Sequence, residues 1–539
     1  MKATKIILAS SVLALMAGCG GSGDSKTQRT VERPTTSAIS ELKQTYKYQL
    51  VFVDATGTTL EPIDDELTVT FAGTATDVVD STGASLAGKT VAVTDGMLSI
   101  AANLSDSNYF TVVAGNRSKG WQETGIQLSK TNSKAGSQTV LVKLLNTGDA
   151  ATINANTNLG LAMVTETANL GAGYTKSTTA KTVNNESIGT ATISIPAGTK
   201  VYDENGAELS ANGVNVSIVK FGNNESRALS AFPGGFAPTV VDSTGASRND
   251  GAFITGGFAQ FNLTAANGTP IKKFSGNIEL SIDLPKDSKN PATGAALAVG
   301  DTYPVWSFDE TTGNWKFEAN GTISAKANGD WTVTFTTNHL SYWNLDYYYN
   351  TCTATLNLNR TAQDNRPLNF EIIGENGLRF FRSYSAVRDS SQTIFNYPRN
   401  TKVNVKVLSG NTVVGETTAP VDLCAGASVP VAAPSNVVSG ITVNVTESCP
   451  SGSNKRPVPA YIDLVRSDWS DWLFEYGTSG NFTGLEQGSQ YNLWVYNTRN
   501  WSFQSQVITV GATSQTIDIN YPNLQCESVV ITGASGASN

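Results

Sequence analysis

The sequence has little of what enzymes and nucleic-acid-binding proteins usually need. It contains one histidine, His339, among 539 residues, and charged residues make up only 15% of the chain. No CxxC pair and no GxSxG motif occurs, which argues against a zinc site and a serine-hydrolase elbow. The net charge is −8, so the basic surface expected for nucleic-acid binding is missing. We therefore predict a non-enzymatic protein with no cofactor, no bound metal and no nucleic-acid partner, in which His339 is a structural residue beside aromatic side chains.

Residues 1–18 predict a lipoprotein signal peptide. Two lysines precede an apolar run at 6–17, which is too short for a permanent transmembrane helix. The run ends in LMAGC at 15–19, and small residues before a cysteine resemble the lipobox of bacterial lipoproteins, although Met16 stands where leucine is usual. The resemblance implies cleavage before Cys19 and a lipid on its sulfur.

The residues after Cys19 predict where the lipoprotein is sorted. Two glycines follow it rather than aspartate, which, by resemblance to Gram-negative sorting signals, favours the outer membrane, on its periplasmic or surface-exposed face. Several acyl chains on one residue bind a membrane more firmly than one chain. Residues 19–44 are rich in Ser, Thr, Gly and Lys without periodicity, so they are expected to form a flexible tether.

The remaining chain is predicted to be an all-β, multidomain series of tandem β-sandwiches. Removing residues 1–18 from the 539 leaves 521, enough for about three to five domains. Thr and Gly are abundant, no second apolar run reaches bilayer length, and short alternating segments are separated by turn residues. Large apolar residues recur throughout, which excludes a disordered chain.

Two segments resemble known β modules. The order LVFVDATG, DGMLSIAANL and YFTVVAGNRSKGW within residues 45–146 resembles the carboxypeptidase regulatory-like, prealbumin-like sandwich. Residues 147–349 contain GTATISIPAGTKVYDENGAEL and YPVWSFDETTGNWKFEANGT, and they resemble a module of bacterial secreted lipoproteins related to ZU-type domains. That resemblance implies a structural or interaction role without catalytic residues. Trp306, Trp315 and Trp343 are expected to pack in its core or hairpins.

The last two segments, 350–430 and 437–534, look like a diverged repeat. TATLNL parallels ITVNVTE, and NTKVNVKVLSG parallels GSQYNLWVYNT. Each segment again resembles a carboxypeptidase regulatory-like sandwich. Domains of this size have small cores, for which a disulfide is a common reinforcement.

Four cysteines remain after Cys19: Cys352, Cys424, Cys449 and Cys526. An even number beyond an oxidising export route indicates two disulfides, and four cysteines allow three connectivities. We favour 352–424 and 449–526, because the two spacings are similar and each pair brackets one repeat. The rival 424–449 bond would instead join the end of one domain to the start of the next.

One motif match is rejected on context. GASLAGKT at 83–90 fits the phosphate-binding P-loop pattern, which needs a helix after it. The following VAVTDG predicts a strand and a turn, so no nucleotide is expected. VVDSTGAS also occurs twice, at 78–85 and 240–247, as a recurring hairpin turn would.

Acidic side chains are too scattered to define a site. DENG at 203–206 and DDE at 64–66 could supply calcium oxygens, but neither completes a ligand loop, and hairpin turns explain both. Two of the many carboxylates could also converge as a glycosidase pair, so a hydrolase remains the third-ranked function.

The one surface cluster worth weighing is SDWSDWLFEYG, which contains Trp469, Trp472 and Tyr476. Aromatic faces beside carboxylates suit sugar rings, whereas the alternative is that they cover the edge of a small core. We therefore predict a non-enzymatic lipoprotein that is adhesive, scaffolding or matrix-associated. The second hypothesis is a glycan-binding lipoprotein of a carbohydrate-uptake system. The expected partners are the membrane, through the lipid, and a glycan or other surface proteins.

Overall fold

The computed structural model describes residues 28–532 apart from short gaps. The gaps are 38–39, 56–60, 131–132, 134, 149, 156–158, 184–185, 224–227, 230, 237, 291–294, 362–363, 365, 375–378, 383–388, 400, 410–411, 434–437, 468, 470 and 500–501. The predicted signal peptide and Cys19 lie outside the described residues. Apart from one helix, α1 (Ala150–Ala155), and two short 3-10 turns, the described regular elements are strands. The all-β, multidomain prediction is confirmed.

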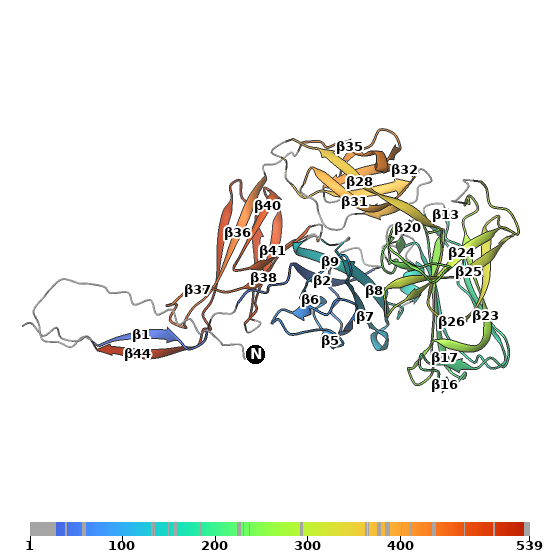
Figure 1. Cartoon of the computed structure of the whole chain (residues 1–539), viewed down its shortest axis with the longest axis horizontal. Coiled ribbons are helices and arrows are strands. Elements are labelled where there is room, and N and C mark those ends of the chain that lie inside the picture. The colour runs from blue at the N-terminus through green and yellow to red at the C-terminus, as the bar shows by residue number, and fades with distance from the viewer. Residues whose placement is uncertain are drawn as a thin grey trace, which may run out of the picture. The chain divides into compact units, whose positions relative to one another are not determined.

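The chain divides into two compact units (Figure 1). The terminal unit combines the two ends of the chain with residues 447–456, and the main unit comprises residues 39–446 and 457–520. Each unit is described separately below.

The main unit begins with a first sandwich formed by two four-stranded sheets. Their facing sides enclose a core that includes Tyr48, Phe52 and Phe110, all fully buried. One sheet has the order β4 (Val78–Asp80), β6 (Met97–Ala102), β2 (Tyr46–Asp54), β9 (Gly136–Leu144), and the other β5 (Thr90–Val93), β3 (Leu67–Gly73), β7 (Tyr109–Asn116), β8 (Trp121–Ser129).

The strand β2 departs from simple alternation. Its side chains from Tyr48 to Val53 are buried on both faces of the sheet. Tyr48, Leu50 and Phe52 face the core of the first sandwich, while Val51 and Val53 belong to a separate cluster on the opposite face. A strand buried on both sides reads as a continuous apolar run, and LVFV is such a run.

A central module follows, built on one large sheet with two hydrophobic clusters. Trp306, Trp315 and Trp343 are buried in these clusters, as the sequence predicts. The sheet order is β10 (Leu161–Ala168), β17 (Val214–Phe221), β21 (Gly257–Thr264), β27 (Tyr342–Leu345), β24 (Thr302–Asp309), β25 (Asn314–Ala325), β26 (Trp331–His339), β23 (Lys273–Leu284), β14 (Ala191–Ile195), β11 (Tyr174–Ser177). The same sheet also contains the short strands β15 (Val201–Tyr202), β16 (Glu208–Leu209), β18 (Val240–Val241), β19 (Ser247–Arg248) and β22 (Pro270–Ile271), whereas β12 (Thr182–Val183) and β13 (Glu186–Ser187) form a separate two-stranded sheet.

The third sandwich has its own core around Leu356, Ile372 and Val405. Its first strand, β28, runs without interruption across residue 350, where the sequence suggested a domain boundary. One sheet contains β20 (Gly251–Phe253), β28 (Tyr348–Asn359), β31 (Ser391–Pro398) and β35 (Ala427–Pro430). The other contains β30 (Arg379–Arg382), β29 (Asn369–Gly374), β32 (Lys402–Ser409), β33 (Thr412–Glu416) and β34 (Val421–Asp422).

The fourth sandwich completes the main unit. Its buried residues alternate along the strands, as in Tyr491, Leu493 and Val495. One sheet contains β37 (Arg456–Pro457), β36 (Val438–Glu447), β40 (Ser479–Glu486) and β43 (Gln515–Tyr521). The other has the order β39 (Trp472–Gly477), β38 (Ala460–Arg466), β41 (Gln490–Asn497), β42 (Phe503–Thr509).

The terminal unit contains a two-stranded antiparallel ribbon formed by the two ends of the chain. The strand β1 (Gln28–Pro34) pairs along its whole length with β44 (Cys526–Thr532). Residues 19–44 were expected to form a flexible tether, and residues 28–34 of that segment instead form a strand. The residues of β1 are mostly polar and show no alternation of apolar and polar side chains, so their sequence does not distinguish a strand from a loop. The strand forms because it pairs with β44, which is distant in the sequence. We call β1 and β44 the terminal ribbon.

Candidate functional site

The two predicted disulfides are confirmed. Cys352 bonds to Cys424 with 5.9 Å between their Cα atoms, and Cys449 bonds to Cys526 at 5.8 Å. The rival 424–449 pairing is therefore absent, and all four sulfurs are used in disulfides.

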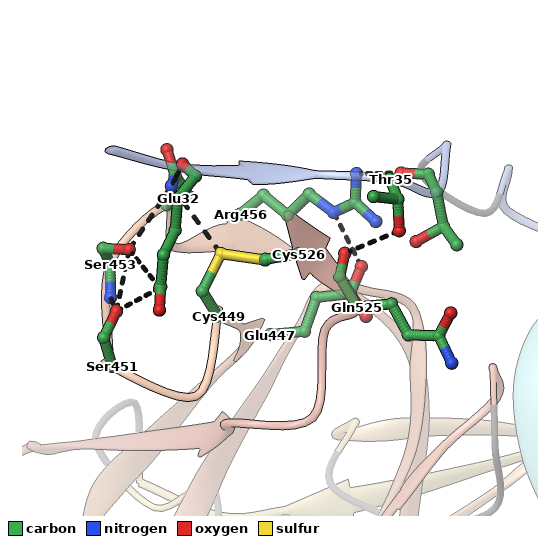
Figure 2. Close-up of a disulfide and its surroundings, with 11 residues drawn as sticks. Glu32, Thr35, Glu447, Cys449, Ser451, Ser453, Arg456, Gln525 and Cys526 are labelled. Atoms are coloured by element: carbon green, nitrogen blue, oxygen red, sulfur yellow. Dashed lines mark hydrogen bonds and ion pairs between the residues drawn. A yellow bond between two sulfur atoms is a disulfide. The ribbon is translucent and has the colours of Figure 1, made fainter. Parts of the chain in front are cut away.

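The 449–526 disulfide lies beside the start of the terminal ribbon (Figure 2). Cys449 opens a tight turn, because its N–H donates to the Ser453 carbonyl at 2.9 Å. The turn reaches β1, where the carboxylate of Glu32 accepts hydrogen bonds from the hydroxyls of Ser451 and Ser453. The side-chain amide of Asn454 donates to the Glu32 carbonyl. Both strands of the ribbon are thus tied to the same turn.

An arginine completes the tie. Arg456 Nε donates to the Glu447 carboxylate at 2.7 Å, and the Glu447 side chain is fully buried. Arg456 Nη1 also donates to the carbonyl of Thr36 at 2.9 Å. A guanidinium can hold a carboxylate and backbone carbonyls together because it has five donors in a fixed plane. The segment that follows β1 is therefore held by the same residues as the disulfide turn.

The predicted aromatic cluster lies where the fourth sandwich meets the first within the main unit. Trp472 is 9% exposed and packs with Val465 against Val51 and Val53 of β2. Trp469 is partly buried at the edge of the same cluster, and its ring lies 5.7 Å from that of Trp472. Trp472 thus joins two sandwiches, and Trp469 keeps part of its surface in solvent.

Tyr476 lies on the same side of the fourth sandwich. Its backbone N–H donates to the Ser137 hydroxyl at 3.2 Å, and its own hydroxyl accepts from the N–H of Leu42 at 3.1 Å. The Lys47 ammonium lies 5.7 Å from its ring centre. Of the three proposed ligand residues, Trp469 and Trp472 lie side by side, and Trp472 and Tyr476 each contact the first sandwich.

A buried carboxylate accompanies the tryptophans. Asp463 is fully buried, and its Oδ1 accepts a hydrogen bond from the Trp472 indole at 2.8 Å. Burial raises the pKa of Asp463 to about 7, and the indole hydrogen bond opposes that rise only in part. The sequence analysis did not single out Asp463. Its only sequence signal is an acidic residue within an otherwise apolar predicted strand, AYIDLVR.

The P-loop lookalike forms a hairpin turn. In both copies of VVDSTGAS, the first aspartate (Asp80 or Asp242) accepts from the amide two positions later, at 2.8 and 2.9 Å, and from the amide four positions later. Asp203 in DENGA makes the same two contacts. After 83–90 the chain continues as the strand β5. Local hydrogen bonding by aspartate explains all three segments.

His339 lies at the end of β26 beside aromatic side chains, as expected. Its ring centre is 5.0 Å from that of Trp343, and its Nε2 is 3.4 Å from the carboxylate of Glu318. Burial by itself raises the pKa of Glu318, but hydrogen bonds from His339, Ser307 and Lys316 outweigh it and bring the pKa to about 2. The contacts place His339 in a partly buried hydrogen-bonded pair with Glu318 on a packed strand.

A polar cleft of about 560 Å³ lies between the first sandwich and the central module. Arg117 Nη1 donates to the Asn262 side chain at 2.6 Å, and the Asn262 amide donates to Gln122 Oε1 at 2.6 Å. Its described lining residues are Arg117, Ser118, Gly120, Gln122, Thr147, Gly148, Thr165, Glu166, Thr167, Asn215, Val216, Ser217, Asn262, Thr264 and Gly268. Hydroxyl and amide groups dominate, which suits a neutral ligand rich in hydroxyls. No aromatic ring is among these lining residues.

Sequence reasoning missed this cleft and a buried lysine. The cleft combines residues of two modules, so no local pattern marks it. Lys220 in β17 is 1% exposed, and its ammonium donates to the Phe221 carbonyl at 2.9 Å. Burial lowers its pKa to about 8 despite the nearby carboxylates of Asp283 and Asp330. The sequence signal that could have identified Lys220 is a lysine within the predicted strand VNVSIVKF, at a position whose side chain faces the interior.

The described part of the chain brings together no three side chains of the metal-ligating types His, Cys, Asp and Glu.

Within the described residues, no helix has the length and hydropathy needed to cross a membrane.

No family model and no curated protein matches the chain. Among solved structures, it is similar to the minor pilin GBS52 of Streptococcus agalactiae, with 10% identity, 34% of this chain and 100% of that chain covered, and a TM-score of 0.15. It is also similar to the Bacillus anthracis TIE protein, with 12% identity, 66% and 75% covered, and a TM-score of 0.15. A third is the major pilin subunit BcpA of Bacillus cereus, with 10% identity, 88% and 98% covered, and a TM-score of 0.11. These TM-scores are too low for the likenesses to support a function, so the proposals below depend on the residues of this chain.

Proposed function

We propose that the protein is a non-enzymatic lipoprotein, anchored to the Gram-negative outer membrane through Cys19, with an adhesive or scaffolding role. The observation that carries this proposal is the contact in which Trp472 covers Val51 and Val53. The aromatic side chains that could have bound a ligand pack between two sandwiches and hold them together. Such packing suits a structural protein that connects its partners, rather than an enzyme that converts a substrate.

The lipobox LMAGC supports the anchor. The contacts of the terminal unit support a load-bearing function, because β1 begins at Gln28, nine positions after Cys19, and is tied to a disulfide turn. Chain ends are usually the least ordered part of a domain unless they are tied down. Here the end beside the expected anchor is tied to the rest of the terminal unit.

The proposal is tested with the full chain and a Cys19→Ser variant. Radiolabelled palmitate should enter the wild type and not the variant, and only wild-type cells should gain attachment to surfaces coated with matrix proteins. Label retained by Cys19→Ser would overturn the anchor. Turnover of a glycan or peptide substrate by the purified chain would overturn the non-enzymatic role.

Glycan binding is the second candidate, and the polar cleft is the observation that favours it. Asn215 is exposed in the cleft wall, and its side-chain oxygen accepts a hydrogen bond from the Thr167 hydroxyl at 2.9 Å. In a glycan array with the full chain, Asn215→Ala should weaken binding about tenfold, equivalent to about 1.4 kcal/mol, if the cleft is the site. Trp469→Ala is the matched control, since the sequence pointed to that residue. Loss in Trp469→Ala alone would place the site at the tryptophans, and no binding by the wild type would reject this candidate.

A further inference from the structure

The terminal ribbon has two outer edges with different chemistry. The N–H of Thr35 donates to the Gln525 carbonyl at 2.9 Å, so that pair is hydrogen-bonded in the ladder. Backbone groups alternate inward and outward along an antiparallel pair. With Pro34 opposite Cys526 and Thr30 opposite Val530, the even-numbered residues of both strands direct their N–H and C=O groups outward. The two edges can therefore be compared position by position.

The outer edge of β1 is closed over its half nearest the disulfide, at Glu32 and Pro34. Pro34 has no N–H to offer, and the outward carbonyl of Glu32 accepts the Asn454 side-chain amide. The Glu32 carboxylate is held by two serine hydroxyls of the same turn (Figure 2). Proline and charged residues are common means of protecting a sheet edge.

The outer edge of β44 is open in the described structure. β44 pairs only with β1 among the described strands. The outward residues Ser528 and Val530 are exposed, Val530 by 52%. The strand reads CESVVIT, with Glu527 as its single charge and four consecutive β-branched residues. An exposed edge of this composition is a template for another strand.

We propose that the open edge of β44 pairs with β44 of a second copy of this chain, antiparallel, to form a four-stranded sheet across a two-fold axis. A pairing centred on Val529 places Glu527 opposite Ile531 and Ser528 opposite Val530, so no like charges face each other. The corresponding pairing of β1 about Val31 would set Arg29 against Arg33. The charge pattern therefore favours self-pairing through β44 and opposes it through β1.

The membrane anchor would strengthen this contact, and this part of the inference rests on the proposed function. The nine positions from Cys19 to Gln28 can span at most about 30 Å. Copies held in one membrane would keep their ribbons within that distance of its surface and at a high local concentration. Pairing would then link neighbouring copies laterally, which is a specific form of scaffolding.

The test uses the full-length chain in its own membranes with a Val529→Cys substitution. Residues that face each other in a non-hydrogen-bonded antiparallel pair have Cα atoms about 4.5 Å apart, within reach of a disulfide. Mild oxidation should give a reducible band at twice the monomer mass. Adding Val530→Pro should abolish this band, because it removes an outward N–H and leaves the ladder with β1 intact. Adding Thr30→Pro, directly opposite on the outer edge of β1, is the matched control and should leave the band unchanged.

Three results would overturn the proposal: no dimer band, a band that survives Val530→Pro, or a crosslink to a different protein. Peptide mapping should first show that the 352–424 and 449–526 bonds are retained. The Cys19→Ser chain separates this inference from the anchor. The Cys19→Ser chain should dimerise at high concentration in sedimentation equilibrium, and Val530→Pro should prevent this dimerisation. That result would support self-pairing through β44 even if palmitate labelling showed that the wild type carries no lipid.

Discussion

The third sandwich and the terminal unit each contain one disulfide, with nearly the same spacing of 72 and 77 residues, but the two bonds hold different parts of the chain together. Cys352 lies within the first strand, β28, and with Cys424 it packs against the core of the third sandwich. Cys449 follows the end of β36, and Cys526 begins β44. One bond reinforces a core, and the other reinforces the terminal unit. Similar spacing therefore predicted the pairing but not what each bond stabilises.

Removing either disulfide should produce the largest effect on stability. The double variants Cys352→Ala/Cys424→Ala and Cys449→Ala/Cys526→Ala should each lower the free energy of unfolding of the part of the chain that contains the bond by about 4 kcal/mol, because the released loops are of similar length. Denaturant unfolding followed domain by domain would measure this. A loss confined to one of the two variants would show that unfolded-chain entropy does not dominate.

The native states of the two variants should differ even where their stabilities agree. Loss of 449–526 should speed hydrogen exchange at the inward amides of Val31 and Val529, because a two-stranded ribbon is marginal by itself. Loss of 352–424 should leave both amides protected. Equal exchange in the two variants would contradict the separation of the terminal unit from the third sandwich.

The second prediction concerns the outer face of the fourth sandwich. Trp472→Ala should cost about 3 kcal/mol, since it removes a buried aromatic ring from the contact with β2. Trp469→Ala should cost less, because its ring is only partly buried. Val413→Ala on the third sandwich, where Val413 is 48% exposed, should change the melting temperature very little. A neutral Trp472→Ala would disprove the contact between the first and fourth sandwiches.

The third prediction is a pH dependence that distinguishes the two sandwiches. The buried Asp364 of the third sandwich is paired with Arg366 at 3.2 Å, whereas Asp463 of the fourth has an indole partner and a pKa raised to about 7. Because the folded pKa of Asp463 is raised, its contribution to stability is complete below about pH 4 and is lost as pH rises to about 7. Asp463→Asn should flatten the stability profile of the fourth sandwich across that window. An unchanged slope would assign the pH dependence to other groups.

The smallest expected effect is local to the terminal unit. Asn454 has a φ of 53° and donates to the Glu32 carbonyl. Asn454→Ala should weaken the ribbon by about 1 kcal/mol, since it loses that hydrogen bond and strains a left-handed residue. Asn454→Gly loses the hydrogen bond without the strain and should be milder. Hydrogen exchange of β1 would report both, and equal effects would show that backbone strain is negligible there.

The sequence by itself determined the features that depend on near neighbours. Alternating apolar residues predicted strands, because a pleated strand presents successive side chains to opposite faces. Aspartates in DSTGA and DENGA predicted turns, because their carboxylates bond to amides two and four positions along the chain. Paired cysteines with similar spacing predicted both disulfides.

Only the tertiary structure decided what each exposed face or edge meets. Alternation shows that Val51 and Val53 share one face of β2, but not that Trp472 covers them. The pairing of Val31 with Val529 and the hydrogen bond from Arg117 to Asn262 join residues far apart in the chain. Such contacts depend on how whole domains fold and pack. A local pattern of side chains does not show which distant segment will pack against it. For this reason the predicted tether concealed a strand, and the predicted ligand cluster proved to lie at a contact between sandwiches.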